Sequence, residues 1–229
     1  MVATPLVDII AVGLDNGEIL IVNIRKCAIL FRMKQKRTVT ALAFSQSEPY
    51  MASADESGNI LLWDLENRKI IYRMEAALSH EIDHLVFIPN IALLLAGSSQ
   101  GNTLKQLRIN REDAKTLTLF RERCGSSSPI NFVKCQNSKE ITYSTQQSVH
   151  FSSIYSHSNN YSLPIRSYYL DSRLPYFLIS NHFNVEIYKE RTLFCKVNIH
   201  EVAEFGAISA SHKYAVVASS KRLLKIAIA

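Results

Sequence analysis

The sequence predicts an all-β fold assembled from repeated four-stranded sheets, and two observations carry this prediction. The stretch Gly17–Met33 recurs 41 residues later as Gly58–Met74, with six identical positions. Along the chain, short apolar strands are separated by polar, glycine-bearing turns roughly every 8–12 residues, which is the spacing of all-β proteins. Four strands in about 41 residues make one blade of a β-propeller, so the sequence predicts a row of such blades.

The second copy shows the repeat most completely. It contains the dipeptide Trp63-Asp64, and this dipeptide in a repeat of about 40–45 residues is typical of WD-repeat propellers. The turn Asp55–Gly58 separates its two central strands. The four strands expected in this copy are Val39–Ser45, Tyr50–Ala54, Asn59–Trp63 and Lys69–Met74.

The copies on either side of it are less complete. The first has three expected strands and no opening strand, and its tight turn contains Asn16-Gly17, a pair that accepts positive φ at low cost. In the third copy Gly101 follows Gly58 by 43 residues, and the tryptophan position falls on Gln106. The expected strands are Val7–Val12, Glu18–Ile24 and Ala28–Met33, and then Ile82–Phe87, Ile91–Gly97 and Asn102–Ile109.

Beyond residue 110 the repeat fades, but three further units bring the prediction to about six blades, some degenerate or incomplete. The sixth unit lacks its last strand, and Cys124–Pro129 is a turn-rich segment expected to be exposed. We predict that residues 1–163 form blades one to four and that residues 164–229 form degenerate blades. Two arrangements stay open: six blades that close imperfectly, or a segment of a tandem double propeller whose second propeller begins in residues 164–229. The expected strands are Ile130–Lys134, Glu140–Ser144, Ser148–Ser152 and Tyr161–Pro164; Tyr168–Tyr169, Tyr176–Ser180, Val185–Tyr188 and Leu193–Val197; and Val202–Ala210, Tyr214–Ser219 and Leu223–Ile228.

Composition favours a folded protein without membrane spans. Hydrophobic residues make up 47% and charged residues 20% of the 229, and no apolar run reaches the ~18 residues of a membrane helix. The net charge of +6 permits an acidic partner such as RNA. The densest basic segment is Lys34-Gln35-Lys36-Arg37, and a segment this short is more often a solvated loop. We therefore regard three residues, Lys34, Lys36 and Arg37, only as hypothetical RNA contacts.

Three side chains of the second copy are predicted to form a structural network. Ser53, Asp55 and Trp63 occupy positions whose side chains form a buried hydrogen-bonded network in WD repeats. The histidine of that network would fall near Gln35, so the sequence predicts an incomplete network. A catalytic role for Ser53 has no nucleophile-elbow sequence to support it.

One segment has the literal form of a metalloprotease motif. His80-Glu81-Ile82-Asp83-His84 matches H-E-x-x-H, which binds zinc when a helix places both histidines on one face. The repeat instead predicts that the segment runs from a loop into a strand. Residues four apart in an extended chain lie about 13 Å apart, too far to share a metal. No metal, cofactor or catalytic site is therefore predicted, and the protein is not expected to be an enzyme.

Five stretches carry a resemblance to a known family: Ile10–Ile24, Gly58–Leu65, Ala77–Phe87, Leu94–Leu104 and the tail Ile208–Ile226. In their order along the chain, they resemble a nucleolar WD-repeat protein that is a subunit of the UTP-B complex of the small-subunit processome. The tail resembles a later repeat that opens the second of two tandem propellers. Departures from that family are Leu78 at its blade histidine and Gln106 at a usual aromatic.

The resemblance implies a non-catalytic scaffold in the nucleus, in the nucleolus, that supports small-subunit pre-rRNA processing and ribosome assembly. Its implied partners are other WD-repeat and helical subunits of the UTP-B complex, together with pre-rRNA and a small nucleolar ribonucleoprotein. The alternative function is a generic WD-repeat adaptor in another nuclear complex, such as a chromatin or ubiquitin-ligase assembly. Sequence does not separate these two functions, because propellers serve many unrelated partners.

Overall fold

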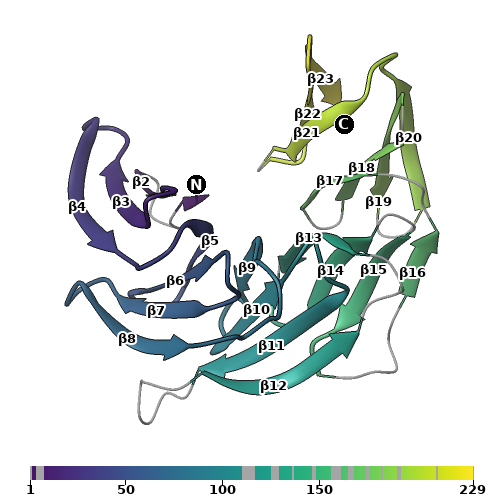
Figure 1. Ribbon diagram of the computed structural model, residues 1–229. Coiled ribbons are helices and arrows are strands. Elements are labelled where there is room, and N and C mark those ends of the chain that lie inside the picture. The colour runs from purple at the N-terminus through teal and green to yellow at the C-terminus, as the bar shows by residue number, and fades with distance from the viewer. Residues whose placement is uncertain are drawn as a thin grey trace. The chain divides into compact units, whose positions relative to one another are not determined.

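The computed structural model consists of β-strands joined by turns and short links (Figure 1). It contains no helix that is long and apolar enough to cross a bilayer, within the residues that the structure describes. Those residues are 2–3, 8–109, 117–124, 129–135, 137–145, 148–155, 161–164, 168–173, 176–181, 183–189, 192–209 and 211–228.

The described strands form six sheets, and in each sheet neighbours in sequence are neighbours in space. The first sheet contains β1 (Val2–Ala3), β2 (Ile9–Gly13), β3 (Glu18–Asn23) and β4 (Ala28–Lys34). The second contains β5 (Val39–Phe44), β6 (Tyr50–Asp55), β7 (Ile60–Asp64) and β8 (Lys69–Met74). The third contains β9 (His84–Phe87), β10 (Leu93–Gly97), β11 (Thr103–Ile109) and β12 (Leu117–Cys124).

The fourth and fifth sheets repeat this order with four strands each, and the sixth sheet has three. The fourth contains β13 (Ile130–Cys135), β14 (Glu140–Thr145), β15 (Ser148–Ser153) and β16 (Tyr161–Pro164). The fifth contains β17 (Tyr168–Arg173), β18 (Tyr176–Asn181), β19 (Asn184–Lys189) and β20 (Thr192–Asn198). The sixth contains β21 (Ala203–Ile208), β22 (Tyr214–Ser219) and β23 (Leu223–Ala227).

The predicted all-β blades are confirmed, with two corrections. The first blade does have an opening strand, because Val2–Ala3 pairs with Ala11 and Ile10. Two residues are too few to show a periodic pattern in sequence. The third blade gains β12, which the sequence interpretation did not assign, and β12 reaches Cys124 at the start of the segment expected to be a turn. The rest of that segment up to residue 128 lies outside the described residues.

The chain divides into two compact units, Met1–Lys139 and Glu140–Ala229. This boundary falls within the fourth sheet, between β13 and β14. The division into residues 1–163 and 164–229 as separate sets of blades stays a prediction. In the second unit, apolar residues of the fifth and sixth sheets form one core cluster, which includes Leu178, Val185, Ala215 and Val217.

In the first unit, the central blade buries both of its faces. Successive side chains of a strand point to opposite faces of its sheet. On β7, Ile60 and Leu62 pack in the same cluster as Leu94 of the third sheet, whereas Leu61 and Trp63 pack with Ile19 of the first sheet. This alternation explains why β7 is a nearly continuous apolar run, since both faces of its sheet are covered.

The hydrogen-bond ladder corrects the position that corresponds to Trp63 in the third blade. Met51 pairs with Trp63, and its counterpart Leu94 pairs with Leu107. The turn before β11 is one residue longer than the turn before β7, because Gly97 pairs with Leu104 where Ala54 pairs with Ile60. Leu107 therefore takes the place of Trp63. The prediction of Gln106 is wrong by one residue, and a one-residue slip reverses the face of the sheet.

A backbone clamp joins each of the first two blades to the next one. The link that leaves the outer strand passes over the glycine turn of the same blade: Gln35 N donates to Gly17 O at 2.9 Å, and Leu78 N donates to Gly58 O at 3.3 Å. Both glycines have positive φ, 83° and 77°. A Cβ atom on Gly58 would lie 2.0 Å from Leu78 O, so this link fits only over a residue without a side chain.

We expect Gly58→Ala to destabilise the second blade by about 1–3 kcal/mol, because alanine adopts positive φ at a cost and its methyl group meets backbone. The lone tryptophan, Trp63, lies in the same blade and reports its unfolding by fluorescence in a urea titration. Gly101→Ala is the matched control, because a Cβ atom there meets its nearest atom at 3.6 Å. Equal stability of the two variants would contradict the clamp.

Candidate functional site

In the side-chain network of the second blade, Gln35 takes the position of the histidine and joins Ser53 and Trp63. Trp63 Nε1 donates to Ser53 Oγ at 2.8 Å, and Ser53 Oγ donates to Gln35 Oε1 at 2.7 Å. The Gln35 amide donates in turn toward the carbonyl oxygens of Arg37, Thr38 and Ala54 at 3.2–3.4 Å. Glutamine can take this position because it supplies both an acceptor and a donor, as a histidine does.

Asp55 does not join Ser53 and Trp63 in this network. Its carboxylate caps the turn that follows β6, where Oδ1 accepts from Ser57 N at 2.8 Å and from Asn59 N at 3.0 Å. Its other oxygen accepts from the Asn59 amide at 2.9 Å. Asp55 therefore holds the Gly58 turn, over which the Leu78 link passes. Ser53 and Trp63 instead hold the preceding link, which passes over Gly17, through Gln35.

In the third blade the whole network is replaced by apolar side chains. The positions of Gln35, Ser53 and Trp63 are taken by Leu78, Ala96 and Leu107, and these three residues are buried in one cluster. Because all three polar side chains are replaced together, none of these three positions keeps a buried polar group that lacks a hydrogen bond. The apolar set is therefore tolerated. Gln106 lies on the opposite face, 0% exposed, and neither of its amide atoms has a partner among the described residues.

The network also presents the basic segment. Gln35 is 5% exposed, whereas its neighbours Lys34, Lys36 and Arg37 are exposed. One anchored side chain therefore turns three cations outward. Arg37 lies 3.9 Å from Glu56, and such an exposed ion pair contributes little to stability. We call the end of the blades that carries this segment and the glycine turns the link end.

The metalloprotease motif has no zinc-binding geometry in this structure. His80 lies in a bend, the next three residues are irregular, and His84 begins β9, so the predicted path from loop to strand is confirmed. Asp83 accepts hydrogen bonds from Ser99 N at 2.9 and 3.0 Å, and its Oδ1 lies 3.3 Å from His84 Nε2. In the described part of the chain, no group of three or more His, Cys, Asp or Glu side chains is placed to hold a metal ion.

A serine–histidine pair in the fourth blade escaped the sequence interpretation. Ser148 Oγ lies 2.6 Å from His150 Nε2, and the imidazole stacks on Tyr143 with ring centroids 4.7 Å apart. Burial lowers the pKa of His150 below its ordinary value, because desolvation disfavours the charged imidazolium. The two residues are two apart on β15, and a strand places such residues on one face. This pair stabilises the blade surface.

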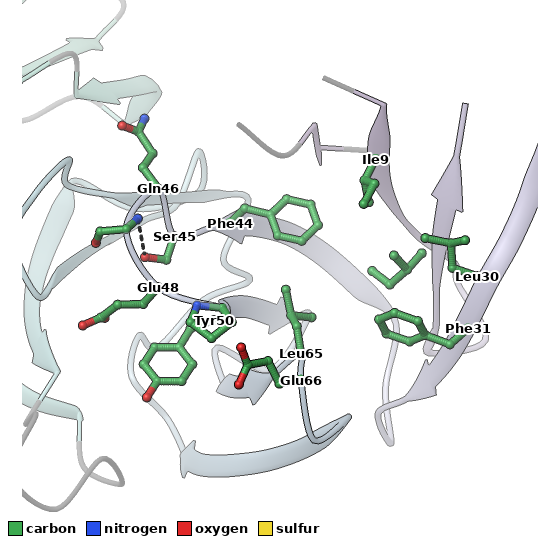
Figure 2. A pocket seen from close by; sticks show the side chains of 13 residues that line it. Ile9, Leu30, Phe31, Phe44, Ser45, Gln46, Glu48, Tyr50, Leu65 and Glu66 are labelled. Carbon is green, nitrogen blue, oxygen red and sulfur yellow. Dashed lines mark hydrogen bonds between the residues drawn. The ribbon is translucent and has the colours of Figure 1, made fainter. Parts of the chain in front are cut away.

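An apolar pocket of about 510 Å³ lies between the first and second sheets (Figure 2). It opens at the end of the blades opposite the link end, where the turns Ser45–Pro49 and Leu65-Glu66 lie. We call this the pocket end. One wall consists of Ile9, Leu30 and Phe31 from the first blade; the other contains Tyr50 and Leu65 from the second. Its volume is in the range of sites that bind drug-sized groups.

A β-bulge gives the pocket one of its apolar walls. In the ladder between β3 and β4, Ile21 pairs with Phe31 and Val22 pairs with Ile29, so Leu30 is the extra residue. A bulge re-aims the side chain of its extra residue. As a result, Leu30 and Phe31 both line the pocket although they are consecutive. The wall is held from the other blade, since Arg68 Cζ lies 4.8 Å from the centroid of the Phe31 ring.

Comparison with known proteins shows which proteins this chain is similar to. A model described as the WDR36/Utp21 first β-propeller matches residues 1–110. The first part of the chain is therefore similar to that propeller. Human WD repeat-containing protein 36 is 33% identical over 148 residues, which cover 62% of this chain and 16% of that protein. The Schizosaccharomyces pombe U3 small nucleolar RNA-associated protein 21 homolog is 29% identical over 170 residues, covering 74% and 17%.

Solved structures show the same fold in other settings. A structure described as U3-55K superposes with a TM-score of 0.80 at 13% identity, covering 97% of this chain and 75% of that one. A chain of the mitotic checkpoint complex superposes with a TM-score of 0.78 at 17% identity, covering 97% and 74%. The chain spans about a sixth of the length of its curated relatives. Its WD-repeat propeller fold is therefore shown.

We expect Gln35→Ala to destabilise the second blade by about 1–3 kcal/mol, because Ser53 and Trp63 lose the buried acceptor at the end of their chain. Urea unfolding followed by Trp63 fluorescence measures the loss. Gln46→Ala removes an exposed glutamine from the pocket end and serves as the control. Gln35→His is expected to keep most of the stability, since histidine also accepts and donates. Wild-type stability of Gln35→Ala would sink this account of the network.

Proposed function

We propose that this chain is a non-catalytic scaffold of the small-subunit processome that supports pre-rRNA processing and ribosome assembly in the nucleolus. The match of residues 1–110 to the WDR36/Utp21 first β-propeller carries this proposal. The relative from S. pombe is by name a U3 small nucleolar RNA-associated protein. The proposed partners are other WD-repeat and helical subunits of the UTP-B complex, with pre-rRNA and its small nucleolar ribonucleoprotein contacted directly or through them.

The blades suit a scaffold because they present different chemistry at their two ends. The link end of the first two blades carries the cations Lys34, Lys36 and Arg37, and the pocket end carries an apolar hollow. The clamp and the network fix the backbone between these ends. Surfaces held in this way bind a partner with little ordering cost, which favours affinity through rigid presentation.

The buried side chains also favour a structural rather than a catalytic role. Ser53 is 0% exposed, and its hydroxyl is shared between Trp63 and Gln35. Substrate cannot reach it without unfolding of the blade. The HEIDH segment does not place its histidines on one helix face. Non-enzymatic function is therefore part of the proposal.

The alternative function, a WD-repeat adaptor in a chromatin or ubiquitin-ligase complex, has weaker support. The likeness to a chain of the mitotic checkpoint complex is 17% identical and shows the fold alone. The WDR36 and Utp21 matches are both closer in sequence, and these are the proteins that point to the processome.

Affinity purification of the tagged chain with mass spectrometry tests the proposal. We expect nucleolar WD-repeat and helical processome subunits among the co-purifying proteins, and nucleolar fluorescence of a tagged copy. Gly58→Ala, which weakens a blade, is expected to lose them. Recovery of chromatin or ubiquitin-ligase subunits without processome subunits would establish the alternative instead.

We further expect Lys34→Glu with Lys36→Glu to weaken crosslinking to pre-rRNA and to lower the salt dependence of RNA binding, since each phosphate contact contributes about one unit of slope. Lys26→Glu with Lys69→Glu is the matched control, because it changes the charge equally at exposed residues of the pocket end. Equal crosslinking by the two double variants would show that the link end does not contact RNA.

A further inference from the structure

We propose that the pocket between the first two blades binds a short peptide segment of a protein partner, in which a large apolar side chain enters the pocket beside a lysine or arginine. The proposal concerns a surface that the processome assignment does not use, and it holds or fails independently of that assignment. Three features of the pocket carry it: its fixed walls, its apolar lining and the charge of its rim.

The pocket is formed within one compact unit and is held open by contacts across it. Its thirteen lining residues all lie between Ile9 and Glu66. The two turns that border it are tied together, because Leu65 N donates to Pro49 O at 2.9 Å. The stacked Arg68 holds Phe31 from the second blade. A preformed pocket spares a ligand the entropic cost of ordering its walls.

Part of the apolar lining is exposed to solvent, at a position that the core of the blade does not require to be apolar. Leu30 is 44% exposed, and the β-bulge turns it toward the pocket. Phe44 closes the floor and is buried, and Ile21 lies beside it. Filling this hollow with an aliphatic or aromatic side chain removes apolar surface of both partners from water, at roughly 25 cal/mol for each Å² buried.

The charges at the rim of the pocket determine which charge a ligand should carry. Among the thirteen lining residues, the ionisable acids and bases are Glu48 and Glu66, with no lysine or arginine. Figure 2 shows both carboxylates on the Tyr50 side of the pocket, across from Leu30 and Phe31. The chain as a whole carries +6, but charges more than about 8–10 Å away are screened at physiological salt. Arg68 stacks on Phe31 from outside the lining, so two carboxylates stand against one guanidinium at the rim. The local preference is therefore for a cation next to the apolar anchor.

This combination selects one class of occupant. RNA is disfavoured, because its phosphates would meet the carboxylates of Glu48 and Glu66 at the rim and the lining residues include no lysine or arginine. A small apolar metabolite makes no use of the charge at the rim. A peptide segment that carries an apolar anchor and an adjacent basic residue matches floor and rim together. Such anchors in pockets supply most of the energy of protein–protein contacts.

Selection of a phage-displayed library of random peptides on the immobilised full chain tests the proposal. We expect enrichment of peptides with a large aliphatic or aromatic residue next to lysine or arginine. Leu30→Glu is expected to lower the affinity of a selected, fluorescently labelled peptide by at least about tenfold, which corresponds to about 1.4 kcal/mol. Glu66→Lys is expected to weaken peptides that carry the basic residue and to spare their alanine-substituted forms.

Two matched variants keep the test specific. Ile29→Glu changes a neighbouring residue of β4 that is 46% exposed and lies outside the lining, so it is expected to bind as the wild type does. Glu75→Lys repeats the charge change at the link end. Trp63 fluorescence shows whether each variant is folded. Equal binding by Leu30→Glu and Ile29→Glu, selection of acidic peptides, or no enrichment would each overturn the proposal.

The remaining alternative occupant of the pocket is a second copy of the chain, and sedimentation velocity distinguishes it from a peptide of another protein. We expect the chain to sediment as a monomer at every concentration tested, and Leu30→Glu to sediment as the wild type does. Self-association that Leu30→Glu abolishes and Ile29→Glu keeps would assign the pocket to a copy of this chain and overturn the peptide proposal. Retention of processome subunits in pull-downs with Leu30→Glu leaves the scaffold function standing, so failures of the two proposals are distinguishable.

Discussion

The close passage of each link over the glycine turn of its own blade is the constraint on which the first unit depends. Gln35 N and Leu78 N donate to Gly17 O and Gly58 O, and the Cβ positions of both glycines are filled by link backbone. The clamp delivers the chain to the first strand of the next blade in a fixed register. Once that register is set, alternation along the strand decides which residues face each neighbouring blade. Packing of the cores and exposure of the loops both follow.

Two chemical solutions satisfy the same clamp in adjacent blades. In the second blade, Gln35 closes a polar chain with Ser53 and Trp63, while the third blade uses an apolar set at the equivalent positions. Both leave the buried atoms at these positions satisfied, so the backbone is common and the side chains differ. The polar version has one further consequence: by burying Gln35 it fixes the adjacent cations at the surface. Stability and the presentation of a binding surface are thus linked in one residue.

The two ends of the blades therefore support different contacts. The link end is basic and is held by hydrogen bonds, whereas the pocket end is apolar with carboxylates at its rim. A protein with these properties suits a role as a spacer that holds unlike partners at a set separation. The similarity of residues 1–110 to the WDR36/Utp21 first β-propeller is consistent with such a role, and the proposed peptide would bind at the end opposite the basic segment.

The sequence by itself determined the repeat, the strands and the glycine turns, because a period of about 41 residues and two-residue alternation are local patterns. It also predicted that His80–His84 runs from a loop into a strand. Only the tertiary structure decided the rest: that Gln35 joins the network, that Leu107 rather than Gln106 replaces Trp63, and that Leu30 faces the pocket. These depend on a turn length, a bulge and contacts between residues distant in sequence. Such features shift a side chain from one face to the other without changing the apolar pattern that sequence reveals.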